Sequence, residues 1–130
     1  MFGINKVVAT RYAFPLKISS SQRYLTDSNG VPFLYNADTG WFIFDKVSME
    51  EYDIYLDNRV SKDFNTIHIM APWNHDVPNY YGEYPFLAHT DITKPNEAWW
   101  SLVDVFIQKA AERGILVNIV PLWLGYFGAE

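Results

Sequence analysis

The chain has 130 residues, a net charge of -5 at pH 7 and no cysteine, and 49% of its residues are hydrophobic. This composition is typical of a folded globular domain. The scattered basic residues argue against nucleic acid as a partner, and the absence of cysteine excludes disulfides and thiolate metal sites. No segment approaches the roughly 20 apolar residues of a membrane span, so no membrane partner is expected. The first 21 residues lack the apolar stretch of a signal peptide, and a cytoplasmic location is the default expectation.

Two short strand-like runs, Leu16–Ile18 and Arg23–Thr26, precede the turn sequence of residues 27–30. They predict a small β-hairpin ahead of the main core. The apolar, aromatic-rich run Phe33–Ala37 then predicts a first strand that is buried on both faces.

A helix is expected next, because Ser48 and Glu51 have the spacing of a capping box. Its apolar stripe consists of Met49, Tyr52, Leu56 and Val60. The β-branched run Thr66–Met70 predicts a second strand.

A connection of about 25 residues follows, from Ala71 to Pro95, which is far longer than the usual connection of about 4–6 residues. It is too aromatic for disorder and is expected to be ordered and packed over another part of the chain. Its aromatic residues include Trp73, Tyr80, Tyr81, Tyr84 and Phe86.

Asn96 is the expected cap of a second helix over Glu97–Arg113, with Gly114 in a left-handed conformation at its end. Ile115–Leu122 is the expected third strand. The order strand, helix, strand, helix, strand predicts neighbouring parallel strands with both helices on one face.

Several sequence motifs, in the same order and spacing, resemble the N-terminal half of the apiosidase-like family of (β/α)8-barrel glycoside hydrolases. They are residues 33–41 (FLYNADTGW), 55–59 (YLDNR) with 64–65 (FN), 81–86 (YGEYPF), 95–98 (PNEA), 110–114 (AAERG) and 121–123 (PLW). The chain departs from the family at Asp63, where a helix-ending Gly is usual, and at His68, where Gln is common. Asp tolerates a left-handed turn at modest cost.

The resemblance implies an α/β fold, a partial TIM-type barrel of about three parallel strands and two helices after a short hairpin. Residues 1–15 are expected to be an N-terminal extension and residues 16–130 the N-terminal portion of the barrel. A full barrel needs about 250 residues. In this family the acid and nucleophile carboxylates lie on later strands, so the catalytic residues are not expected in this chain. Family-like proteins can be exported.

Polar residues recur on the strands at positions that we expect to face the barrel interior, where substrates of this fold bind. They are Asn36 and Asp38 on the first strand, His68 on the second and Asn118 on the third. Aromatic or polar residues at strand ends are expected to stack on or hydrogen-bond to a sugar ring. The candidate substrate-binding residues are Asp38, Trp41, His68, Trp73, Asn74, His75, Asn118 and Trp123. The alternative is structural: a turn or cap role for Asp38, and a buried hydrogen-bond network for His68 and Asn118.

No metal or other cofactor is expected, because neither His75 with Asp76 nor His89 with Asp91 has the spacing of a known metal site. Glu97 opens a helix, where a dipole role explains it better than catalysis.

Three functions follow from the sequence. The first is a truncated apiosidase-like glycoside hydrolase whose family cleaves plant-type glycosides with paired carboxylates, inactive alone because later strands are absent. The second is a non-catalytic carbohydrate-binding module. The third is an interaction fragment, which associates with itself or is completed by another chain through exposed sheet edges. A carbohydrate is the expected ligand in the first two.

Overall fold

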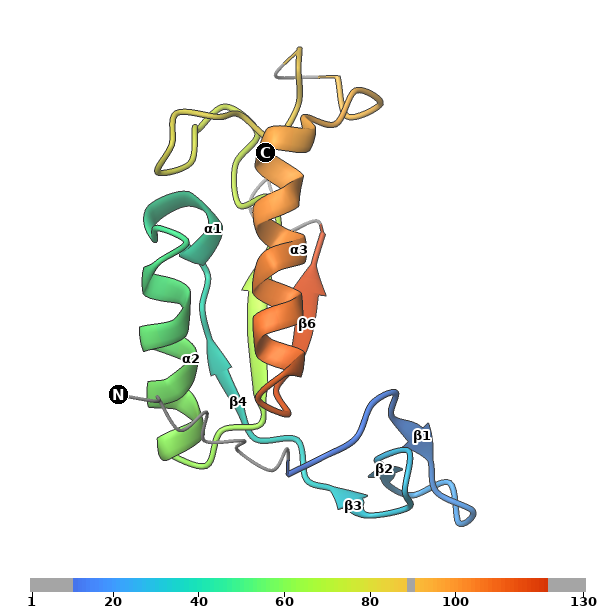
Figure 1. The fold of residues 1–130 in the computed structure, drawn as a ribbon. Helices are drawn as coiled ribbons and strands as arrows, with labels where there is room; N and C mark the ends of the chain where they lie inside the picture. The colour runs from blue at the N-terminus through green and yellow to red at the C-terminus, as the bar shows by residue number, and fades with distance from the viewer. Residues whose placement is uncertain (1–10, 89–90, 122–130) are drawn as a thin grey trace, which may run out of the picture.

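The computed structural model describes residues 11–88 and 91–121, and it places the helices of the main layer against one face of a parallel sheet (Figure 1). Within these residues the sheet has three strands in the order β4-β5-β6. The strands are β4 Ala37–Thr39, β5 Thr66–Met70 and β6 Leu116–Val120. Both neighbouring pairs are parallel, so the predicted strand order and direction are confirmed.

A small antiparallel sheet lies near the N-terminal ends of the parallel strands (Figure 1). It consists of β1 Lys17–Ile18, β2 Leu25–Thr26 and β3 Pro32–Phe33. The predicted hairpin is therefore confirmed, and a further strand joins it. The buried carboxylate of Asp27 organises this unit, because it accepts hydrogen bonds from the backbone N–H groups of Ala13 at 3.0 Å, Asn29 at 2.9 Å and Val31 at 2.8 Å. These bonds, that of Ala13 foremost, lower the pKa of Asp27.

The prediction of one strand over Phe33–Ala37 was wrong. Phe33 ends β3, whereas the first parallel strand begins at Ala37, and Leu34 and Tyr35 between them are 78% and 44% exposed. The side chain of Asn65 ties this connection down: its Oδ1 accepts from the N–H of Asn36 at 2.9 Å, and its Nδ2 donates to the carbonyl of Leu34. The backbone groups of this connection are hydrogen-bonded by a side chain and not by a neighbouring strand. An apolar run in the sequence does not distinguish these two cases.

The helices among the described residues are α1 Ile43–Lys46, α2 Glu51–Ser61 and α3 Glu97–Ala111. The predicted cap at Asn96 is present, whereas the predicted capping box of α2 is present only in part, because the N-cap is Glu50 and makes no side-chain cap hydrogen bond. Glu51 accepts from the N–H of Ser48 at 2.9 Å, and Asn96 accepts from the N–H of Ala98 at 3.1 Å. Asp63 adopts a φ of 63° in the left-handed region, as expected for a residue at the end of α2. Helix α1 is short and was not predicted.

The main core lies between the parallel sheet and helices α2 and α3. Ile67 and Ile69 of β5 pack there with Leu56 of α2 and Phe106 of α3, and all four are fully buried. Because side chains alternate along a strand, His68 lies on the opposite face of β5. In a (β/α) barrel that opposite face is the interior.

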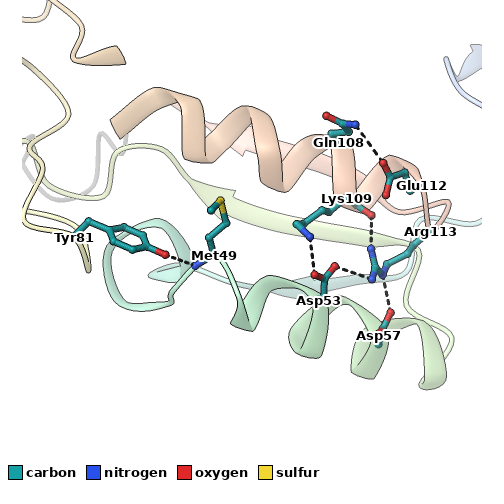
Figure 2. A network of polar contacts seen from close by, with 8 residues as sticks. All are labelled: Met49, Asp53, Asp57, Tyr81, Gln108, Lys109, Glu112 and Arg113. Carbon is teal, nitrogen blue, oxygen red and sulfur yellow. Dashed lines mark hydrogen bonds and ion pairs between the residues drawn. The ribbon is translucent and has the colours of Figure 1, made fainter. Parts of the chain in front are cut away.

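Salt bridges join the solvent-facing sides of α2 and α3 (Figure 2). Asp53 of α2 pairs with Lys109 at 2.6 Å and with Arg113 at 2.8 Å, and Arg113 also pairs with Asp57 at 2.6 Å. The hydrogen bond from Lys109 is the largest cause of a lowered pKa at Asp53. This network holds the two helices in register outside the apolar core.

Candidate functional site

Three polar side chains form one layer across the barrel-side face of the sheet. The strand register pairs Thr39 with His68 and His68 with Asn118. Side chains at paired positions of neighbouring strands point to the same face, so these three are neighbours. His68 and Asn118 lie where the sequence predicted them, whereas Thr39 was missed because the start of its strand was misplaced.

Asp38 does not belong to this layer, which corrects a prediction. It is paired in register with the core residue Ile67, so it faces the helices. Its Oδ2 accepts a hydrogen bond from the Tyr55 hydroxyl at 2.7 Å and lies 3.1 Å from Nε of Arg59. Asp38 therefore attaches β4 to α2. Asn36 precedes β4, and its amide donates to the carbonyl of Asp63 at 3.1 Å, so it does not join the layer either.

Tyr35 is a residue of the barrel-side face that the sequence analysis missed. Its hydroxyl accepts a hydrogen bond from Nδ2 of Asn118 at 2.9 Å. Tyr35 precedes β4, and Asn118 lies in the middle of β6, so the phenol side chain reaches across the intervening strand β5. This contact fixes the orientation of the Asn118 amide. It could not be predicted without knowing the order of the strands.

Trp41, which follows the C-terminal end of β4, forms an aromatic pair with His68 in the middle of β5. Their ring centroids are 5.6 Å apart at an interplanar angle of 67°. The tight turn after β4 sets this position, because the N–H of Gly40 donates to the carbonyl of His68 at 2.8 Å. A Cβ at Gly40 would lie 2.5 Å from Cδ1 of Ile43, so the turn is packed closely against α1.

Phe42 and Trp73 form a second aromatic pair, with centroids 5.0 Å apart and rings at 74°. Phe42 belongs to the connection after β4, and Trp73 to the connection after β5, so the pair joins two loops at the same end of the sheet. Trp73 was predicted as a site residue and Phe42 was not. The signal that could have found Phe42 is its position beside Trp41, directly after the strand end.

The polar residues after Trp73 lie in a turn of the same loop. Oδ1 of Asn74 accepts from the N–H of Asp76 at 2.9 Å, and Nε2 of His75 lies 3.4 Å from a carboxylate oxygen of Asp76. Asn74 and His75 are half-buried. They are therefore close to Trp73 along the chain but are partly engaged within their own turn. Trp123, the last predicted site residue, lies outside the described residues.

The described residues of the long loop between β5 and α3 contact α3 and the start of α2, in agreement with the predicted packing of this loop. The hydroxyl of Tyr81 accepts from the N–H of Met49 at 2.8 Å, next to the start of α2 (Figure 2). The indole N–H of Trp100 donates to the carbonyl of Pro85 at 2.9 Å, and Nδ2 of Asn96 donates to Glu83 at 2.9 Å. The loop is thus fixed at the end of the sheet where the two aromatic pairs lie.

The described ranges 11–88 and 91–121 hold neither a metal-binding cluster nor a helix able to cross a membrane. No cluster of three or more His, Asp or Glu side chains there is arranged to hold a metal ion. None of the helices in those ranges has the length and apolar content needed to cross a membrane.

Comparisons with known proteins agree with this geometry. The sequence matches the family described as apiosidase-like, catalytic domain, over residues 19–130. A glycoside hydrolase family 5 crystal structure from Bacteroides vulgatus is similar at 29% identity and a TM-score of 0.69, covering 81% of this chain and 24% of that one. A second structure, described as a glycoside hydrolase, is similar at 28% identity and a TM-score of 0.71 with the same coverage. The chain thus spans about a quarter of the length of these structures. Among curated proteins no match is found.

The strand order, the face on which both helices pack and the family match all indicate the same architecture, the first part of a TIM-type barrel. The chain belongs to the apiosidase-like family of glycoside hydrolases.

Proposed function

We propose that this chain supplies part of the carbohydrate-binding mouth of an apiosidase-like hydrolase, and that the 130-residue polypeptide alone binds sugar without hydrolysing it. One observation carries the proposal: the Trp41 ring, directly after the C-terminal end of β4, lies against His68 of β5. Substrates of TIM-type barrels bind at that end of the strands. A flat aromatic ring beside polar groups suits a sugar, which has apolar C–H faces and hydroxyl edges.

The proposed sugar contacts are Trp41, His68, Trp73, Asn74, His75 and Asn118. Trp123 remains a candidate from its sequence position alone. We assign Asp38 a structural role, because Tyr55 and Arg59 of α2 both contact its Oδ2. The family description makes an apioside the first substrate class to test.

The expected lack of hydrolysis follows from the positions of the carboxylates. Glycosidases use two carboxyl groups about 5–10 Å apart on either side of the scissile bond. In the described part of the chain, Asp38 contacts α2 and Glu83 contacts Asn96, so we assign these two carboxylates structural roles and not the roles of the catalytic pair.

The test measures binding and turnover separately. The 130-residue chain is incubated with p-nitrophenyl β-D-apiofuranoside, and binding is followed by saturation-transfer NMR while release of nitrophenol is followed by absorbance. The proposal predicts saturation transfer that Trp41→Ala abolishes and no turnover above background. Tyr80→Ala is the control, since Tyr80 is 62% exposed in the long loop. Turnover that a single carboxylate substitution abolishes would refute the inactivity, and absence of saturation transfer would refute the sugar site.

A further inference from the structure

The hydroxyl of Tyr55 lies against the turn that connects β4 to Trp41. Tyr55 belongs to α2 and packs against the main core. A Cβ built on Gly40 would lie 3.1 Å from the Tyr55 hydroxyl oxygen, so this oxygen borders the side of Gly40 on which a side chain would project. The contact is separate from the hydrogen bond that the same hydroxyl donates to Asp38. Tyr55 therefore contacts both strand β4 and the residue that follows it.

Two neighbours fix the orientation of the Tyr55 side chain. Its hydroxyl donates to Oδ2 of Asp38 at 2.7 Å, and the guanidinium of Arg59 lies 4.8 Å from the centre of its ring. Burial is the largest cause of a raised pKa at Tyr55, and the hydrogen bond to Asp38 and the charge of that carboxylate raise the pKa further. The hydroxyl thus stays protonated near neutral pH and presents an oxygen atom in a fixed position to the turn at Gly40.

Gly40 is held on its other sides by backbone hydrogen bonds and by one apolar side chain. Its N–H donates to the carbonyl of His68 at 2.8 Å, and its carbonyl accepts from the N–H of Ile43 at 3.3 Å. Cδ1 of Ile43 would lie 2.5 Å from a Cβ at Gly40. The turn therefore needs a residue without a side chain, and the space between Ile43 and the Tyr55 hydroxyl sets the path of the backbone.

Trp41 is the next residue, so the path of the backbone at Gly40 sets the position from which its indole ring projects. The ring meets His68 with centroids 5.6 Å apart and planes at 67°. The carbonyl of the same histidine accepts from Gly40, so β5 fixes both the turn and the ring contact. Removal of the Tyr55 hydroxyl would leave a gap beside Gly40, and the surrounding chain relaxes partly into a gap of this kind.

We propose that Tyr55 is a positioning residue, whose hydroxyl holds the turn at Gly40 and thereby keeps the Trp41 ring in the orientation that receives a sugar. The inference rests on the proposed sugar-binding function and assigns to it a residue of the helix side. Tyr55 does not touch the sugar itself, since it packs with the core between the sheet and the helices. A role limited to joining α2 to Asp38 would leave the contact between Trp41 and His68 unchanged when the hydroxyl is removed.

The experiment removes the hydroxyl and follows the Trp41 ring. Tyr55→Phe keeps the aromatic ring in the core, so the variant is expected to fold. NMR measures the NOEs between the ring protons of Trp41 and His68 without sugar, and the Kd for methyl β-D-apiofuranoside. We expect the NOEs to weaken or vanish. Binding should weaken by about two- to tenfold, because a side chain that is no longer held must be ordered on binding.

Two further variants make the outcome specific. Tyr52→Phe removes a buried hydroxyl of the same helix that has no hydrogen-bond partner among the described residues, and it should behave like the wild type. Asp38→Asn removes the charge that pairs with Arg59 but keeps an oxygen that can accept from the Tyr55 hydroxyl, so it should retain both the NOEs and the affinity.

Unchanged NOEs or an unchanged Kd in Tyr55→Phe would overturn the positioning role and leave the proposed function intact. Equal losses in Tyr55→Phe and Tyr52→Phe, or in Tyr55→Phe and Asp38→Asn, would also overturn it, since the effect would not be specific to the hydroxyl. If the wild type binds no sugar, the proposed function fails, and the NOEs alone decide whether Tyr55 positions Trp41.

Discussion

Asp38 of β4 and Arg59 of α2 form a half-buried ion pair, with Nε of Arg59 at 3.1 Å from Oδ2 of Asp38. The Tyr55 hydroxyl donates to the same oxygen at 2.7 Å, and the guanidinium of Arg59 lies 4.8 Å from the centre of the Tyr55 ring. The pair connects the first parallel strand to the helix that follows it. It also explains why an aspartate in the middle of the family motif does not face the barrel interior.

Replacing Arg59 by Met tests this connection. Side-chain exposures of 24% and 25% mean that loss of the cation leaves a partly desolvated carboxylate, so we expect a loss of about 1–3 kcal/mol in the free energy of unfolding. Urea denaturation measures this. Arg11→Met is the matched control, because the Arg11–Asp63 pair is 61% and 87% exposed and should contribute less than about 1 kcal/mol. Equal effects of the two variants would contradict the structural role of Asp38.

Asp45 predicts an unusual dependence of stability on pH. Burial raises the pKa of this α1 carboxyl from 3.8 to about 6, and among the described residues its Oδ1 has no hydrogen-bond partner. Between these values the folded state holds a proton that the unfolded state has released, so the contribution of Asp45 is present below pH 4 and lost as pH rises through about 6. A pKa difference of about two units changes the free energy of unfolding by at most about 3 kcal/mol.

Asp45→Asn should remove this dependence and raise the free energy of unfolding at pH 8 by about 1–3 kcal/mol, because the amide needs no proton to stay neutral. Thermal unfolding between pH 4 and 8 measures both effects. Asp104→Asn, at an exposed position of α3, should leave the curve unchanged. An Asp45→Asn curve parallel to that of the wild type would show that Asp45 does not titrate in this range.

Asp53→Asn tests the network between α2 and α3. It removes the charge that pairs with Lys109 and Arg113, and we expect a loss of about 0.5–1 kcal/mol at pH 7, since these groups are partly exposed. The pKa of Asp53 is lowered, so its contribution exists above the unfolded value and disappears as the pH falls below it. The difference between variant and wild type should therefore vanish at about pH 2. Glu112→Gln, which removes an exposed carboxylate from the end of α3, is the control.

The turn at Gly40 gives a prediction about coupling. Gly40→Ala would place a Cβ 2.5 Å from Cδ1 of Ile43, a buried side chain, and overpacking of this kind costs about 1–3 kcal/mol. Ile43→Val removes that methyl group. The double variant should lose less free energy of unfolding than the sum of the losses of the two single variants. The difference should be about 1 kcal/mol. Strict additivity would mean that the clash is relieved elsewhere.

The sequence predicted those features that depend on local chemistry. The cap at Asn96, the capping bond between Ser48 and Glu51, and strand β5 were all predictable, because each is specified by a few adjacent residues. The positions of β4 and of Asp38 were not, because the run from Phe33 to Ala37 satisfies the pattern of a buried strand. A one-residue error in a strand reverses the face of every side chain.

The candidate site was predicted only in part, again because the position of β4 was not predicted correctly. His68 and Asn118 follow from alternation within long, well-defined strands. Thr39 depends on the correct start of β4, and the contact from Tyr35 to Asn118 spans 83 residues. Phe42 carries no motif, and its partner Trp73 lies in a loop whose path the sequence does not specify.

The most direct test of the account is to map sugar binding onto the two faces of the sheet. Backbone and side-chain NMR signals of the 130-residue chain are recorded during titration with methyl β-D-apiofuranoside. The account predicts that shifts concentrate at Trp41, His68 and Asn118 on the barrel side, whereas Asp38, Tyr55 and Arg59 on the helix side stay unchanged. Shifts centred on Asp38 and Arg59, or none at saturating sugar, would contradict it.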